Sequence, residues 1–255
     1  MTMHRKTETQ ERPVKSDSKL SRRRFASWCG AVAALLLGRT AQASEKALQP
    51  FAKVALVDQK GRGIKSHKLE PEREYVFFYP YVSTPCFLLR LTQPAESQQL
   101  HTATGETYTW PGGVGDDHSV VAFVAICSHK LTHPSEPVSF IGYRQQPVGF
   151  LGRQNKVVQR AAVIQCCSEH SIYDPMQGCR VLAGPAPQPL GAIVLEERTE
   201  GLYATGVYGG LLYDRFFERF GFRLELEFAN KARQLVTNQA QVMAIEDYTR
   251  QRIQC

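Results

Sequence analysis

The chain alternates short apolar segments with polar segments that contain Gly and Pro. Apolar or alternating runs occur throughout the middle of the sequence, at 53–57, 75–79, 86–91, 119–126, 161–165, 192–196 and 202–207. Runs of this length that are bounded by turn residues are typical of strands. They predict an all-β domain of antiparallel sheets, with polar loops at 93–105 and in the segment that precedes 161.

The pattern changes after residue 207. Leu212, Phe216 and Phe220 are spaced at i, i+4 and i+8, which predicts a helix from about residue 211 that ends near Gly221. A second helix is predicted over 239–253. The sequence thus divides into a signal segment (1–43), a β domain (44–207) and a helical C-terminal extension (208–255), whose helices either pack on the sheet or anchor the protein to a larger subunit.

The N-terminal segment has the form of a twin-arginine export signal. Ser21-Arg22-Arg23-Arg24-Phe25 precedes an apolar stretch at 26–38 and a small-residue cleavage site, Ala41-Gln42-Ala43. The apolar stretch is shorter than the roughly 20 residues that span a bilayer. We expect cleavage after Ala43 and a periplasmic protein, with an uncleaved anchor in the cytoplasmic membrane as the alternative.

Most of the chain's basic character belongs to this signal. The whole sequence has 31 Lys and Arg against 24 Asp and Glu, but nine of the former and three of the latter lie within 1–43, which leaves 22 and 21. A nucleic-acid-binding domain needs a basic footprint on its folded surface. We therefore expect no nucleic-acid partner.

Two short motifs, Cys127-Ser128-His129 and Cys167-Ser168-Glu169-His170, carry the chemistry of the sequence. Two thiolates and two imidazoles divide naturally between the two irons of a [2Fe-2S] cluster, with the cysteines on one iron and the histidines on the other. A structural zinc site is the alternative. Zinc fingers, however, usually pair Cys with Cys and His with His along the chain, whereas here each loop supplies one of each.

The residues after the second motif add a family resemblance. Tyr173-Asp174-Pro175, Gly178 and the Pro-rich stretch at 184–190 resemble the Rieske iron–sulfur protein family. The segment at 112–130 is similar to the small subunit of arsenite oxidase, whereas Gly-Pro-Ala-Pro is more like the cytochrome bc-type Rieske proteins. The resemblance implies stacked antiparallel sheets with a cluster-binding subdomain, in which Cys127, His129, Cys167 and His170 hold the cluster on two loops.

The resemblance also implies two tuning residues. Ser171 and Tyr173 match the family's donors of hydrogen bonds to a bridging sulfide and to a ligand thiolate, which stabilise the reduced cluster. A residue is missing after His170, and Thr132 and Glu169 stand where many members carry a loop-clamping disulfide. Because the charge of Glu169 opposes electron uptake, we expect a reduction potential in the middle or lower part of the Rieske range.

The cysteines leave one choice open. Cys166 stands beside Cys167, and the family's C-x-x-H spacing to His170 favours Cys167, while strand alternation would turn Cys166 away as a small core residue. Pairing among Cys86, Cys166, Cys179 and Cys255 cannot be deduced from the sequence. His133 is interpreted as an ordinary loop histidine.

A 37-residue segment separates His129 from Cys167, about twice the family's usual length. Its aromatic residues either dock a partner or, as we prefer, pack within an elaborated hairpin. These aromatic residues are Phe140, Tyr143 and Phe150.

Together these features predict an exported electron-transfer subunit of an oxidoreductase complex rather than an autonomous enzyme. Its donor would be a partner oxidoreductase subunit, for which the resemblance to the arsenite oxidase small subunit implies molybdenum, and its acceptor a c-type cytochrome. The alternatives are a quinol-oxidising complex with a cytochrome b partner, for which membrane association is expected, and a zinc module. A Rieske oxygenase is excluded, because none of the seven histidines follows His170 to build a mononuclear iron site.

Overall fold

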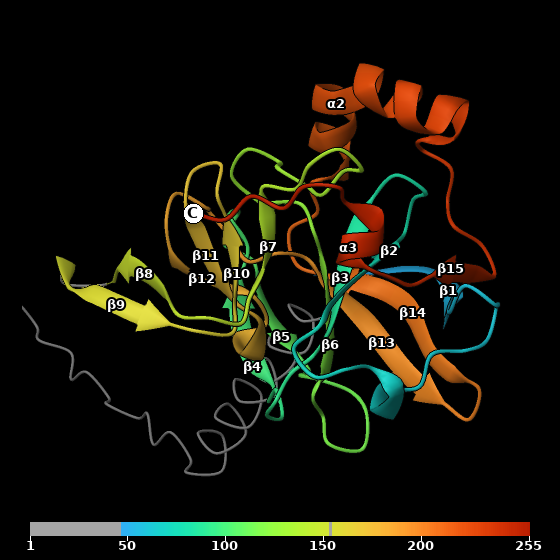
Figure 1. Cartoon of the computed structure of the whole chain (residues 1–255), viewed down its shortest axis with the longest axis horizontal. Coiled ribbons are helices and arrows are strands. Elements are labelled where there is room, and N and C mark those ends of the chain that lie inside the picture. Colours follow the sequence, from blue (N-terminus) through green and yellow to red (C-terminus); the bar gives the residue numbers. More distant parts are fainter. Residues whose placement is uncertain (1–46, 153–154) are drawn as a thin grey trace, which may run out of the picture. The chain divides into compact units, whose positions relative to one another are not determined.

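The computed structural model describes residues 47–152 and 155–255. In this part of the chain strands predominate, arranged in one large and one small sheet with two further hairpins (Figure 1). All seven predicted strands are present, which confirms the all-β prediction. The predicted signal at 1–43 lies outside the described residues.

The large sheet has eight strands in the order β15-β1-β14-β13-β6-β3-β2-β16. All neighbours pair antiparallel except β1 and β15. The strands are β1 (Leu48–Val57), β2 (Glu74–Phe78), β3 (Pro85–Arg90), β6 (Val120–Val124), β13 (Ala192–Arg198), β14 (Gly201–Tyr208), β15 (Gln239–Gln241) and β16 (Met243–Ala244).

The two edge strands of this sheet are consecutive in sequence. β15 pairs with β1 and β16 pairs with β2, and between them the amide of Val242 donates to the carbonyl of Val57 at 2.8 Å. The C-terminal segment therefore joins the two edges and nearly closes the sheet. Closure removes the unpaired backbone groups that an open edge would expose.

The prediction of a second helix over 239–253 is consequently wrong, and only a short helix, α3 (Ile245–Tyr248), forms there. Ala240, Val242 and Ala244 are all buried, at 5%, 5% and 6% exposure. This spacing has the period of two of a strand, and the sheet edges supply backbone partners for it.

The first C-terminal helix, α2, runs over Tyr213–Phe228 and so continues past Gly221. Phe216 is fully buried, and Leu212 and Phe220 pack against the same core, which confirms the predicted apolar face. Leu224 is also buried, which explains why the helix continues after the glycine. No helix among the described residues is long and apolar enough to cross a membrane.

Both faces of the central strands are buried. On β3, Cys86 and Leu88 belong to the core under α2, whereas Phe87 and Leu89 belong to a second core beneath the small sheet. Successive side chains of a strand point to opposite faces, so one apolar run serves two cores. The small sheet is thereby fixed against the large one.

The small sheet has four antiparallel strands in the order β12-β11-β10-β7. Two hairpins complete the fold, and one of them, β4–β5, includes part of the stretch that was predicted as a polar loop. The strands concerned are β4 (Gln98–His101), β5 (Thr107–Trp110), β7 (Ile141–Arg144), β8 (Val148–Leu151), β9 (Val157–Arg160), β10 (Val163–Cys166), β11 (Ser171–Asp174) and β12 (Arg180–Ala183).

The segment between the two motifs forms β7, the hairpin β8–β9 and β10. Tyr143 is buried against the small-sheet core, at 4% exposure, whereas Phe140 is 40% exposed. Leu151 and Val157 on the hairpin are more exposed still.

Candidate metal centre

Two loops at one end of the small sheet carry the predicted motifs. The first follows β6 and begins at Cys127, and the second joins β10 to β11. The loops meet: the carboxylate of Glu169 forms an ion pair with Lys130, and its Oε2 lies 3.4 Å from Nδ1 of His129. The fold therefore brings together two motifs that are separated by 37 residues in sequence.

The first loop is a tight turn around Cys127. The amide of Leu131 donates to the Cys127 carbonyl at 2.9 Å, and the Cys127 amide donates to the Thr132 carbonyl at 2.8 Å. Leu131 has a φ of 61° and its side chain is buried in the core. The loop thus holds the Cys127 side chain, which is 1% exposed, against the small sheet.

Tyr173 on β11 supports this loop. Its hydroxyl lies 3.1 Å from the sulfur of Cys127 and accepts a hydrogen bond from the Ser128 amide at 3.2 Å. The tyrosine ring is fully buried, so the position of the hydroxyl is fixed by packing. Tyr173 therefore lies where the family resemblance places a donor to a ligand thiolate.

The electrostatic surroundings favour the thiolate form of Cys127. A hydrogen bond from the Cys166 thiol, followed by the hydrogen bond from Tyr173, lowers the pKa of Cys127 to about 6, although burial acts in the opposite direction. The same contact and burial raise the pKa of Cys166. A thiolate is the form in which cysteine binds a metal.

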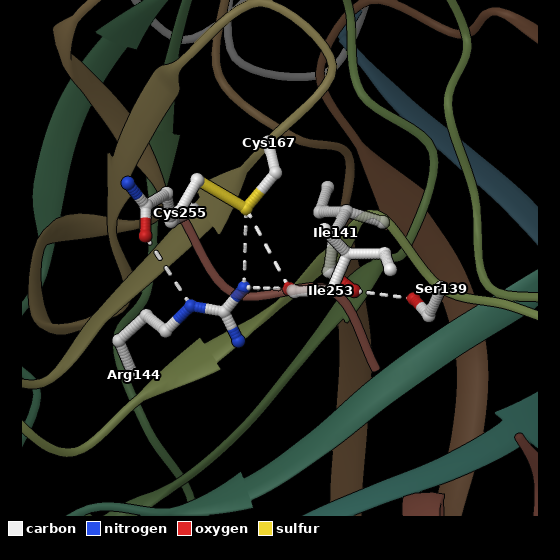
Figure 2. The surroundings of a disulfide bond; sticks show 7 residues. Ser139, Ile141, Arg144, Cys167, Ile253 and Cys255 are labelled. Atoms are coloured by element: carbon white, nitrogen blue, oxygen red, sulfur yellow. Dashed lines mark hydrogen bonds between the residues drawn. A yellow bond between two sulfur atoms is a disulfide. The ribbon is translucent and has the colours of Figure 1, made fainter. Parts of the chain in front are cut away.

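The second loop contains an arrangement that the sequence did not predict. Cys167 forms a disulfide with Cys255, with a Cα–Cα distance of 5.7 Å (Figure 2). Cys166 is a free thiol, 1% exposed, at the end of β10. The sequence selected Cys167 as the ligand; in this structure its sulfur is bonded to Cys255. Strand alternation predicts that Cys166 faces a core, and Cys166 is buried in the core that also contains Cys127.

Two buried polar atoms at the junction of the loops have no hydrogen-bond partner among the described residues. They are Nδ1 of His129 and Oγ of Ser171. The Glu169 oxygen near Nδ1 is not aligned for a hydrogen bond. Buried polar atoms are rarely left unpaired, so both atoms point to a group that would occupy this place. An imidazole nitrogen suits a metal, and a hydroxyl donor suits a sulfide.

His170 occupies a special backbone position. Its φ is 59°, in the left-handed region, and its side chain is exposed, whereas His129 is partly exposed. Ser171 follows at the start of β11, opposite Cys166 in the β10–β11 register. The loop therefore presents the His170 side chain at the surface.

A third segment, the Pro-rich stretch at 184–190, covers both loops. The Ser128 hydroxyl donates to the carbonyl of Gln188 at 2.7 Å. Gly184 has a φ of 85°, and a Cβ atom on it would lie 2.6 Å from the His170 carbonyl oxygen. Only glycine permits this backbone approach, so Gly184 lets the Pro-rich stretch lie directly against the second loop.

His133 lies outside this site. Its Nδ1 contacts the Leu131 carbonyl at 2.9 Å, and its ring packs edge-on against Phe216 and Phe220 of α2. It therefore has the packing role expected of an ordinary loop histidine.

No three His, Cys, Asp or Glu side chains in the described part of the chain could share one metal ion. The predicted ligands Cys127, His129, Cys167 and His170 are therefore not gathered into one such group. The residues near the junction of the loops include two free cysteines and, without partners among the described residues, an imidazole nitrogen and a hydroxyl. These are the residue types that a Rieske-type cluster uses.

No protein-family model matches the chain. Among solved structures, it is similar to the soluble domain of the Rieske protein II (soxF) from Sulfolobus acidocaldarius, with 25% sequence identity over 63% of this chain and 82% of that chain. The TM-score is 0.42.

Proposed function

We propose that the protein is a Rieske-type electron-transfer protein. Cys127 and a second-loop cysteine would hold one iron of a [2Fe-2S] cluster, and His129 and His170 the other. When bound, the cluster would supply one-electron transfer at a potential above that of all-cysteine clusters. The observation that carries the proposal is the unpaired Nδ1 of His129 at the point where the two loops meet.

The surrounding side chains have separable roles in this proposal. Tyr173 stabilises negative charge on the Cys127 sulfur by donating a hydrogen bond. Ser171 is available to donate to an inorganic sulfide, because its hydroxyl has no other partner among the described residues. Reduction makes the ligand imidazoles more basic, so electron uptake would be coupled to proton uptake at a histidine ring.

The exposure of the histidines supports a role in electron exchange with a partner. His129 and His170 lie on the solvent side of the site, while Cys127 and Tyr173 are buried. We propose that an electron enters from an oxidoreductase subunit containing molybdenum and leaves to a c-type cytochrome. A cytochrome b partner in a quinol-oxidising complex is the alternative, suggested by Gly-Pro-Ala-Pro at 184–187.

We propose further that the protein works in the periplasm after export by the twin-arginine route. The sequence Arg22-Arg23-Arg24-Phe25 supports this route, which carries folded proteins with their cofactors. The disulfide between Cys167 and Cys255 supports an oxidising compartment. N-terminal sequencing of the native protein tests it: a start at Ser44 is expected, and an intact N-terminus in the membrane fraction would favour the anchored form.

The test of the cofactor is low-temperature electron paramagnetic resonance of the dithionite-reduced protein, combined with iron and zinc analysis. We expect two irons per chain and a rhombic [2Fe-2S] signal with g values typical of mixed Cys and His ligation. Stoichiometric zinc without that signal would replace the proposal by a structural zinc module.

A further inference from the structure

Cys167, the second-loop cysteine that the family's C-x-x-H spacing selects, is part of a disulfide. The sulfur of Cys167 is bonded to Cys255, 88 residues away, and receives a hydrogen bond from Nη2 of Arg144 at 3.4 Å (Figure 2). Iron is bound by a thiolate, and a disulfide sulfur has no thiolate to offer. In this arrangement Cys167 cannot be a ligand.

Its neighbour Cys166 meets the requirements of a ligand. It is a free, buried cysteine, and its side chain lies in the core beneath the small sheet together with those of Cys127 and Tyr173. Cys166 is free whereas Cys167 is bonded to Cys255, so Cys166 is the second-loop cysteine that can form a thiolate.

The strand geometry explains why the two adjacent cysteines have different surroundings. Ile164 and Cys166 on β10 share the core with Cys127, because alternate residues of a strand face the same side. Cys167 is the next residue and faces away from this core, toward the C-terminal tail. The adjacent cysteines are therefore directed to two different partners by the backbone itself.

The tail that Cys167 holds is attached to the continuation of the first loop. Backbone hydrogen bonds join the Ser139 amide to the Gln251 carbonyl and the Ile253 amide to the Ser139 carbonyl, both at 2.9 Å. Nη2 of Arg144 donates to the Ile253 carbonyl at 2.7 Å, and Arg252 forms an ion pair with the buried Glu74. The tail thus links the segment after the first loop to the second loop.

We propose that Cys166 is the second thiolate ligand and that the Cys167–Cys255 disulfide is a clamp that fastens the second loop to the C-terminal tail. The ligand half of this inference rests on the proposed Rieske function. Many members of the family have a disulfide that joins the two loops, at the positions of Thr132 and Glu169 here. The Cys167–Cys255 disulfide would restrain the second loop in its place, and the C-terminal tail would connect it to the segment after the first loop. The disulfide forms when the two thiols transfer two electrons and two protons to a thiol–disulfide oxidant, whose own disulfide becomes a dithiol.

The native holoprotein tests the assignment without a variant. Non-reducing peptide mapping with thiol alkylation should find the peptides of Cys167 and Cys255 joined, and Cys166 should become alkylated only after iron is removed. Cys167 recovered as an alkylated free thiol would overturn the clamp.

Single variants then separate the two cysteines. We expect Cys166→Ser to lose the iron and the paramagnetic signal but to keep the Cys167–Cys255 peptide pair, which reports that it has folded. Cys167→Ser and Cys255→Ser should keep two irons per chain and the signal, and should release iron to a chelator at least about tenfold faster, because the loop is no longer fastened. Loss of the cluster in Cys167→Ser with retention in Cys166→Ser would reverse the assignment.

The two proposals fail in different ways. If the native protein contains no [2Fe-2S] cluster, the Rieske function and the ligand role of Cys166 are both contradicted. The peptide map still tests whether the Cys167–Cys255 disulfide forms. If the cluster is present and Cys255→Ser releases iron at the native rate, the clamp role falls and the Rieske function stands.

Discussion

The hydroxyl of Tyr173 lies 3.1 Å from the sulfur of Cys127, with both groups buried. In the proposed centre this hydrogen bond strengthens on reduction, when negative charge on the sulfur increases. We therefore expect Tyr173→Phe to lower the reduction potential by roughly 40–90 mV, equivalent to about 1–2 kcal/mol for a one-electron couple. Redox titration followed by paramagnetic resonance measures it. Tyr108→Phe is the control, because it also removes a buried hydroxyl, but one that lies beside Gly209. An equal shift of the potential in both variants would contradict the role of Tyr173.

Glu169 opposes electron uptake in the same centre. Its carboxylate lies 3.4 Å from Nδ1 of His129, and Lys130 and solvent screen its charge only in part. We expect Glu169→Gln to raise the reduction potential by roughly 10–50 mV, with a larger shift at low salt. Glu200→Gln, at the distant β13–β14 turn, should leave the potential unchanged. With Glu169 in place, a native potential above about +250 mV would contradict the expected position in the Rieske range.

His170, at the end of the second motif, and His133, after the first motif, have different roles in the proposed protein. We expect His170→Ala to lose the cluster without unfolding the domain, because its side chain is exposed. His133→Ala should keep the cluster but lower the free energy of unfolding by about 1–3 kcal/mol, because its ring packs against Phe216 and Phe220. Iron analysis and urea unfolding of both variants check this pair. A His170→Ala protein that retains two irons would remove His170 from the ligand set.

The helix α2 offers a matched pair of phenylalanines. Phe216 is fully buried, whereas Phe222 is 79% exposed on the same helix. We expect Phe216→Ala to destabilise the protein by about 3–5 kcal/mol, since it leaves a cavity in the core. Phe222→Ala should change the stability by less than about 0.5 kcal/mol. Urea unfolding measures both, and similar losses would show that α2 does not cover the core as described.

Glu74 gives the stability a pH dependence. Burial raises its pKa to about 7, in spite of the ion pair with Arg252. The native state then holds a proton that the unfolded state releases near its ordinary pKa of 4.5. Stability attributable to Glu74 is fully present below about pH 4.5 and is lost as the pH rises through about 7, by roughly 3 kcal/mol in total.

Glu74→Gln should abolish this loss, so that urea unfolding of the variant varies less between about pH 5 and pH 8 than that of the native protein. Glu106→Gln, which alters an exposed carboxylate, is the control. Parallel stability curves for the native protein and Glu74→Gln would contradict the burial effect.

Local patterns in the sequence were sufficient to predict seven of the strands. The run at 119–126 predicted β6 because a short, continuous apolar run is typical of a strand that is buried on both faces. The same pattern did not reveal that Val121 and Val120 serve different cores, since that depends on which sheet covers each face. Gly184 likewise carried no local signal of the 2.6 Å approach that requires a glycine.

Sequence alone determined which donor types are available for the proposed site, cysteines and histidines in two short motifs, because ligand chemistry resides in the side chains themselves. Tertiary structure decided which cysteine shares a core with Cys127 and which pairs with Cys255, because both depend on contacts between residues that are far apart in the sequence. It also turned 239–244 from a predicted helix into the strands that nearly close the sheet. The unpaired backbone N–H and C=O groups at the edges of β1 and β2 form hydrogen bonds with this segment, and the spacing of its apolar residues contains no information about those partners.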